Sequence, residues 1–214
     1  METLSLLGVA LGFATLSGIN LYLTTFLAGM AIRFNWLDLA EKYDSLAVLA
    51  NPWIIGTAGA LFLVEFFADK IPWLDSSWDA VHTFIRPVGG CLLALAALGE
   101  MDPAITVVAG LLSGGTTLIT HATKAGGRLL VNMSPEPVSN IVTSLGEDSL
   151  VLGGLGLMAF APVVSFFVFL VIVILAVWLS RKTFGTIRRA WIALRNKNQL
   201  ASASQAAPNE PDNE

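Results

Sequence analysis

The residues best suited to chemistry lie in one short stretch between two apolar blocks. Glu65 and Asp69 are four residues apart, and Asp75, Asp79 and His82 follow at spacings of four and three, so a helix would place each set on one face. Clustered carboxylates with an imidazole suit hard cations and proton relays. The stretch therefore predicts a polar hub, defined here as Glu65, Asp69, Lys70, Asp75, Asp79, His82 and Arg86.

Three interpretations of the polar hub are open from the sequence. Its charges can form a salt-bridge network that only pins helix ends, because buried charges need partners in any case. They can instead bind a cation or protons. A carboxylate and His82 can also act as acid and base in a membrane-embedded hydrolase or transferase, although no nucleophile motif accompanies them. The sequence predicts no cofactor, leaves the identity of any metal unknown, and favours a role other than catalysis.

The composition places these residues in a membrane. Of 214 residues, 55% are hydrophobic and 13% are charged, and the mean hydropathy is +0.70. Soluble proteins carry about a quarter charged residues. The single Cys91 excludes an internal disulfide and argues against a thiolate metal cluster. The first residues carry Glu2 in place of a basic segment, so we expect a retained helix rather than a cleaved signal.

The apolar runs predict an all-α membrane domain over residues 1–180 with about five crossings, because several runs approach the roughly 20 residues that span a bilayer. Asn51 and Asp102 are each followed by proline, a typical helix start. Pro72 is expected to end a helix, and the next to begin near Ser76. A short surface helix should run from Ser134 to about Leu145. The expected crossings are residues 3–32, 52–69, 78–99, 103–123 and 162–180.

Two of these runs contain Ser-Gly near the middle, and each is predicted to break there. Aligning the two suggests an internal duplication, residues 1–99 and 103–180, in inverted orientation. Broken helices in inverted repeats point to a transporter's substrate site, whereas small residues also serve close helix packing. A single His121 is typical of packing rather than ligation. The predicted polar path comprises Ser17, Gly18, Asn20, Thr24, Ser113, Gly114, Thr116, Thr117, Thr120 and His121.

The C-terminal segment is basic and then acidic. Residues 181–200 hold six basic residues and no acidic one, with aromatic and aliphatic residues on one helical stripe. Such a helix is expected to lie on an anionic leaflet, and nucleic acid is not expected as a partner. Residues 201–214 are predicted to be a disordered acidic tail. The positive-inside rule places the C-terminus in the cytoplasm, and five crossings place the 34–51 link inside and Asp75 outside.

Three motifs resemble a bacterial membrane family, the domain of unknown function 4126. They are SGINLYL, E-x3-ADKIP-x2-D-x3-D-x2-H-x3-RP and SGGTTLITHATKAG, within roughly residues 5–180. The most specific element is ADKIP, residues 68–72, followed by Asp75 or Asp79 and His82. The resemblance implies an inner-membrane location and a polar site, and it names no substrate.

These features predict a small transporter or channel-like protein that works as a homo-oligomer among membrane lipids, with an ion or a small molecule as its substrate. A non-transporting scaffold or a lipid-interacting accessory protein is the alternative class. A polar cavity joining the two Ser-Gly segments would favour transport, and a dry bundle packed through glycine would favour the scaffold. No motif specifies the substrate, the coupling ion or its direction.

The C-terminus is predicted to be cytoplasmic, because six basic residues immediately follow the most apolar run. A green fluorescent protein fused after Lys197 should fluoresce, and alkaline phosphatase fused at the same residue should be inactive. An active phosphatase without fluorescence would reverse this orientation.

Overall fold

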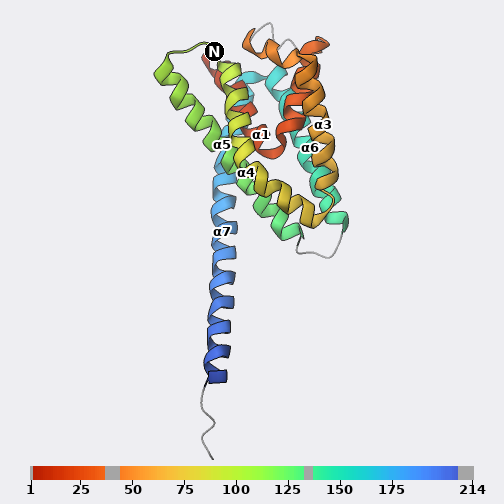
Figure 1. Cartoon of the computed structure of the whole chain (residues 1–214). Coiled ribbons are helices and arrows are strands. Elements are labelled where there is room, and N and C mark those ends of the chain that lie inside the picture. Colours follow the sequence, from red (N-terminus) through yellow and green to blue (C-terminus); the bar gives the residue numbers. More distant parts are fainter. Residues whose placement is uncertain (1, 37–43, 133–136, 207–214) are drawn as a thin grey trace, which may run out of the picture.

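The computed structural model describes residues 2–36, 44–132 and 137–206. All elements in these residues are helical, which confirms the all-α class. The elements are α1 Glu2–Arg33, the 3₁₀ helix η1 Asp44–Ala50, α3 Pro52–Ala68, α4 Pro72–Leu98, α5 Pro103–Asn132, α6 Pro137–Phe160 and α7 Pro162–Ala206. Figure 1 shows a bundle from which the long C-terminal part of α7 projects.

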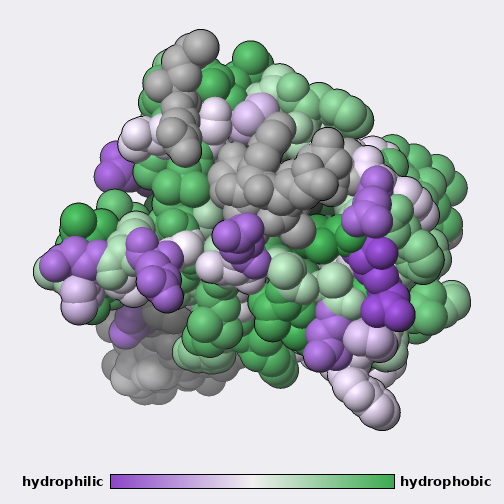
Figure 2. All heavy atoms as spheres, turned by 90° about the horizontal axis from the view of Figure 1, so that it is seen from above, coloured by the Kyte–Doolittle hydropathy of each residue, from purple (hydrophilic) through white to green (hydrophobic). Residues whose placement is uncertain are grey.

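Among the described residues five helices, α1, α4, α5, α6 and α7, are long and apolar enough to cross a membrane. Large apolar side chains are exposed on the outside of the bundle, for example Leu111 on α5 at 72% and Leu152 on α6 at 61%. Figure 2, which looks onto the upper end of the bundle, shows hydrophilic residues in patches among extensive hydrophobic surface. An apolar exterior of this extent suits lipid rather than water. The chain is a multi-pass membrane protein.

Helix α6 differs from the sequence prediction. Residues 137–160 form one helix of 24 residues, where a short surface helix and a glycine-rich stretch were expected. None of its glycines ends the helix, and one of them, Gly154, allows close packing, because a Cβ there would lie 2.7 Å from a methyl group of Leu16 in α1. The predicted cap at residues 134–136 lies outside the described residues. Helix α3, which was expected to cross, has 17 residues. It is long and apolar enough for a membrane span only when η1 is counted with it, and the two helices bend by 65° relative to each other.

Helix α1 is interrupted at Asn20, within the segment where the sequence predicted a break. The φ and ψ angles of Asn20 are −150° and 99°, which are not helical. Its side-chain Oδ1 accepts a hydrogen bond of 2.9 Å from the backbone N–H of Leu23. This is the bond of an N-cap residue. Asn20 therefore ends the first half of α1, residues 2–19, and caps the second half, residues 21–33.

Both ends of α1 lie at the same end of the bundle. Gly8 packs against the first turn of α7, and Leu7 lines a small cavity with Leu98, at the end of α4. Gly29, near the other end of α1, packs against η1, which in turn approaches Gly99. Figure 1 shows α1 entering the bundle, turning near its middle and returning. The expected crossing by residues 3–32 is therefore wrong, because the break at Asn20 reverses the direction of the chain.

The remaining helices, α3 to α7, pass alternately between the two ends of the bundle (Figure 1). These five passages leave the two termini at opposite ends, as five crossings were expected to do. The 34–51 link was expected on the side of the C-terminus and Asp75 on the opposite side. In the structure η1, the described helix of that link, lies at the N-terminal end and Asp75 lies toward the C-terminal end (Figure 1). Both positions are reversed because α1 does not cross and α6 does.

Helix α5 is helical throughout Pro103–Asn132, so the break predicted at Ser113-Gly114 is not found. The carbonyl of Ser113 accepts a bond of 2.9 Å from the hydroxyl of Thr117, one turn later. Such a bond leaves the helical ladder intact. The break of α1 therefore has no counterpart in α5. The internal duplication stays a prediction.

Two helix ends also differ from expectation. Pro72 begins α4 and does not merely end α3, which is consistent with the preference of proline for the first position of a helix. Helix α7 continues without a break from Pro162 through the basic residues to Ala206. The separate interfacial helix over 181–200 is therefore not seen, and residues 201–206 of the expected tail are helical.

The close approach of α1 and α5 yields a test with a matched control. A Cβ at Gly18 would collide with the hydroxyl of Thr120 and lie 2.6 Å from the backbone oxygen of Thr117, whereas a Cβ at Gly115 meets no atom within 4 Å. Gly18→Ala should lower stability by about 1 to 3 kcal/mol, the usual cost of overpacking. Gly115→Ala should leave it nearly unchanged. Thermal unfolding in detergent measures both, and equal melting temperatures would contradict this packing.

Candidate functional site

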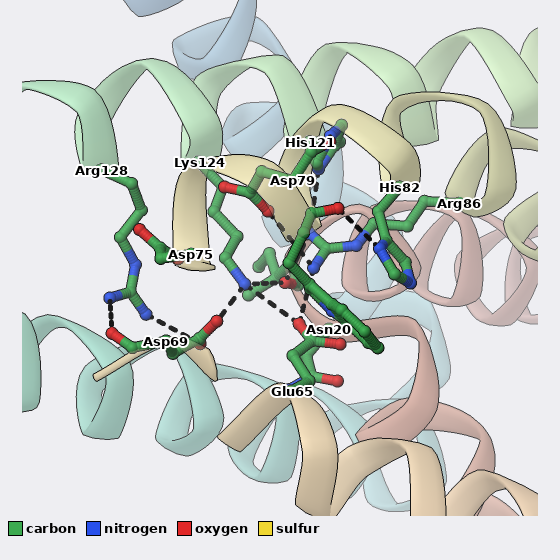
Figure 3. A network of polar contacts seen from close by, with 12 residues as sticks. Asn20, Glu65, Asp69, Asp75, Asp79, His82, Arg86, His121, Lys124 and Arg128 are labelled. Atoms are coloured by element: carbon green, nitrogen blue, oxygen red, sulfur yellow. Dashed lines mark hydrogen bonds and ion pairs between the residues drawn. The ribbon is translucent and has the colours of Figure 1, made fainter. Parts of the chain in front are cut away.

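The polar hub, apart from Lys70, converges inside the bundle beside the break of α1 (Figure 3). Arg86 on α4 pairs with Glu65 near the end of α3, with 2.6 Å between Nη2 and Oε1, and both side chains are fully buried. Asp79, two turns before Arg86, lies 3.6 Å from the same nitrogen. The short connection between α3 and α4 places these side chains opposite each other, as the sequence predicted.

Two further cations come from α5 and were missed in the sequence. Lys124 Nζ lies 3.2 Å from Glu65 Oε1, 3.7 Å from Asp69 Oδ2 and 3.4 Å from Glu147 Oε2. Arg128 binds Asp69 at 2.9 Å and both carboxylate oxygens of Glu147, at 2.8 and 3.1 Å. We define the charge network as Glu65, Asp69, Asp79, Arg86, Lys124, Arg128 and Glu147.

The cations of the charge network also hold the backbone of α1 at its break. Arg86 Nη1 donates to the carbonyl oxygens of Gly18 and Ile19, at 3.0 and 3.1 Å. Lys124 Nζ donates to the carbonyl of Ile19 at 3.0 Å. The last carbonyls of a helix lack intrahelical partners and carry partial negative charge. Arg86 and Lys124 therefore satisfy the end of the first half of α1 within the protein interior.

Acidic groups outnumber basic ones in this interior. The charge network has four carboxylates and three cations. At its edge lie two more carboxylates, Asp75 and Asp148, and one more cation, Lys70. Several buried carboxylate oxygens accept no hydrogen bond, namely Glu65 Oε2, Asp69 Oδ1, Asp75 Oδ1 and Asp79 Oδ1. An ionised carboxylate is costly to bury without partners.

The buried carboxyl groups of this arrangement are groups that can bind protons. Among the described residues no group of three His, Cys, Asp or Glu side chains is placed to hold a metal ion. Burial raises the pKa of Asp69, which lies between α3 and α4, although Lys124 draws it down. A carboxyl group of this kind exchanges protons closer to neutral pH than an exposed one.

Three members of the polar hub, Lys70, Asp75 and His82, lie outside the charge network, and the ring nitrogens of His82 face Trp78 and Tyr22. Lys70 turns back on its own helix, with Nζ 2.7 Å from the carbonyl of Phe66 and 3.1 Å from the centre of its ring. Asp75 is buried and accepts a bond of 2.8 Å from the side chain of Asn132. The sequence-predicted hub therefore supplies one of the three network cations, Arg86, and α5 supplies the others.

The predicted polar path divides into two groups. Ser17, Gly18, Thr24, Thr117, Thr120 and His121 are at or beside the break, together with Asn20. Thr117 Oγ1 donates to the carbonyl of Ala14, at 2.8 Å, which ties α5 to α1. Ser113 and Thr116 line a separate cavity near the N-terminal end, and Gly114 packs against α4. The second Ser-Gly segment is therefore not part of the site.

The residues that the sequence analysis missed had a readable signal. His121, Lys124 and Arg128 follow each other at spacings of three and four, so they share one face of α5. Glu147 and Asp148 are adjacent acids within an otherwise uncharged helix, which also marks a functional or paired position. Asn20 donates to Asp148 at 3.2 Å and so connects α6 to the break.

Two cavities flank the break. One, of about 290 Å³, is bounded by Ile19, Lys124, Arg128 and Glu147 together with parts of α5, α6 and α7. The other, of about 570 Å³, lies between α1, α3 and α4, and Leu21 and Tyr22 form part of its wall. The broken segment of α1 thus contributes residues to both cavities, whose walls are largely apolar.

The chain belongs to a family whose model is described as a domain of unknown function, DUF4126, which matches residues 7–182. A search of curated proteins and a search of solved structures each gave no match. The family match covers every helix of the charge network and assigns no activity to it.

Loss of Arg128 should destabilise the protein strongly. Arg128→Gln leaves Asp69 and Glu147 without their main partner, and breaking a buried pair costs about 3 to 5 kcal/mol. The double variant Arg128→Gln/Glu147→Gln should recover part of this loss, because it removes the orphaned charge. Arg33→Gln, at the exposed end of α1, is the control and should change little. Unfolding of the four proteins in detergent tests this, and a stable Arg128→Gln protein would contradict it.

Proposed function

We propose that this member of the family is a small transporter or channel-like protein in which the charge network binds protons or small cations beside the break of α1. On sequence grounds alone, we further propose that it works in the bacterial inner membrane as a homo-oligomer with a cytoplasmic C-terminus. The substrate class that the site supports best is the proton, because the buried groups are mainly carboxylates and no metal cage is present among the described residues.

The observation that carries this proposal is that Arg86 and Lys124 each bind two kinds of group. Both bind Glu65, and both also bind carbonyl oxygens at the end of the first half of α1. A proton or cation that binds a network carboxylate weakens its hold on these cations. Occupancy of the site is therefore coupled to the contacts that fix the broken helix, and broken helices line ion and substrate sites in transporters.

The position of the break supports the same proposal. Ile19 and Leu21, the neighbours of Asn20, line cavities on different sides of α1. A change in the angle between the two halves of α1 would alter the partition between these spaces. Alternating access in secondary transporters arises from movements of this kind around a fixed site.

A non-transporting scaffold is the competing function, and close helix contacts through glycine favour it. Cβ atoms at Gly12, Gly18 and Gly90 would all collide with neighbouring helices. In that case the charge network only fixes the bundle. Acid–base catalysis by a carboxylate and His82 has less support, since the two ring nitrogens of His82 face Trp78 and Tyr22.

Charge displacement after a concentration jump separates these functions without knowledge of a second substrate. Proteoliposomes adsorbed on a solid-supported membrane should give a transient current when the pH is lowered. Asp79→Asn should reduce this current several-fold, because Asp79 Oδ1 is a buried oxygen without a hydrogen bond. The fold should survive, since Arg86 keeps its 2.6 Å contact with Glu65.

Asp44→Asn is the matched control, because Asp44 is exposed in η1, outside the charge network. It should give the current of the parent protein. Jumps in sodium and potassium concentration at constant pH distinguish protons from other small cations. Absence of current in every jump, with folded protein in the liposomes, would reject the transport proposal and favour the scaffold.

A further inference from the structure

The chain has two histidines, His82 and His121, and both are buried beside Arg86. They lie on neighbouring helices, α4 and α5, but their ring nitrogens face different partners. The hydrogen-bond partners of an imidazole determine which nitrogen carries a proton and whether a second proton is tolerated. The two rings can therefore be assigned different roles from geometry.

His121 is held in one neutral form. Its Nδ1 lies 2.9 Å from Nη1 of Arg86, and a guanidinium group only donates, so Nδ1 accepts and carries no proton. Its Nε2 lies 3.0 Å from the carbonyl oxygen of Asp79, which only accepts, so the proton is on Nε2. A second proton on Nδ1 would point an N–H group at the N–H group of Arg86.

His82 has partners for both of its protonation states. Its Nδ1 lies 2.7 Å from the carbonyl oxygen of Trp78, so this nitrogen carries a proton. Its Nε2 lies 2.8 Å from the hydroxyl of Tyr22. A hydroxyl both donates and accepts. It donates to the neutral ring, and after rotation it accepts from the charged ring, so protonation loses no hydrogen bond.

The surroundings of His82 carry charges of both signs. Burial disfavours a charged ring most, Arg86 on α4 and Lys124 on α5 also oppose it, and Glu65 on α3 favours it. The indole of Trp78 stacks on the imidazole with 4.5 Å between ring centres, and the face of an indole attracts a cation. On α1 the group that faces the ring is the hydroxyl of Tyr22. Arg86 and Lys124 are themselves paired with Glu65, which offsets part of their repulsion.

Tyr22 also connects His82 to a cavity beside the network. Its side chain is half-buried and forms part of the wall of the 570 Å³ cavity between α1, α3 and α4. Its ring meets that of His82 edge to face, with 5.4 Å between centres. A proton that reaches the hydroxyl from this cavity is one hydrogen bond away from Nε2 of His82.

We infer that His82 is a proton-binding site reached through Tyr22, and that His121 stays neutral and positions the guanidinium of Arg86 against the carbonyls of Gly18 and Ile19. The role of this site in ion movement rests on the proposed function, whereas its protonation does not. His82 and His121 are thus not equivalent members of one cluster: one exchanges a proton, and the other orients a cation.

Nuclear magnetic resonance of protein labelled with ¹⁵N-histidine and purified through a tag without histidine tests this directly. Two ring systems of opposite tautomer are expected, one with the proton on Nδ1 and one with it on Nε2. As the pH is lowered through and below the range of about 5 to 8 in which histidine ordinarily titrates, only the Nδ1–H ring should become charged. Because the tautomers differ, this assignment needs no variant.

Variants provide an independent assignment. The titrating signal should be absent in His82→Gln and present in His121→Gln. Tyr22→Phe should lower the titration midpoint, because the charged Nε2–H loses its acceptor. Titration of the Nε2–H ring, charging of both rings, or a pair of rings that stay neutral until the protein unfolds would overturn the inference. Titration of His82 without any current in the liposome experiment would leave this inference standing and reject transport.

Discussion

The structure depends on the contact between cationic side chains and the open carbonyls of a broken helix. Arg86 and Lys124 reach Gly18 and Ile19 from two other helices, and without them the end of the first half of α1 would be buried without partners. Because the same cations neutralise Glu65, the backbone of α1 and the acids of α3 share one set of counterions. That sharing connects the break of α1 to α3, α4 and α5 through one set of contacts.

This arrangement explains why so many charges are tolerated in the middle of an apolar bundle. Each cation has at least two partners, and Arg128 closes the network at the other side by binding Glu147 through two oxygens. Three buried carboxylate oxygens of the network, Glu65 Oε2, Asp69 Oδ1 and Asp79 Oδ1, accept no hydrogen bond. Burial of such an oxygen is costly in a purely structural network, and under the proposed function it can take up a proton. The break of α1, the acidic surplus and the two flanking cavities lie together in one region, and the proposed function is assigned to this region.

The polar hub was predictable because its residues are close in sequence and share helical faces. Glu65, Asp79 and Arg86 need only a short turn between α3 and α4 to meet, and the structure brings them together. The helical spacing of His121, Lys124 and Arg128 was equally visible, but it indicates a face without indicating what that face meets. Lys70 shows the reverse error, since proximity in sequence did not bring it into the charge network.

The sequence by itself determined the class, the membrane location, the broken segment of α1 and half of the site, because hydropathy, helix breakers and helical spacing are local properties. Only the tertiary structure decided that α1 turns back while α5 continues through its own Ser-Gly. Both segments carry Ser-Gly, but only the first has an asparagine two residues later that can cap a new helix, so local preference accounts for part of the difference. The rest of the difference is that Gly18 and Ile19 meet two cations from distant parts of the chain, whereas the carbonyl of Ser113 is satisfied within its own helix.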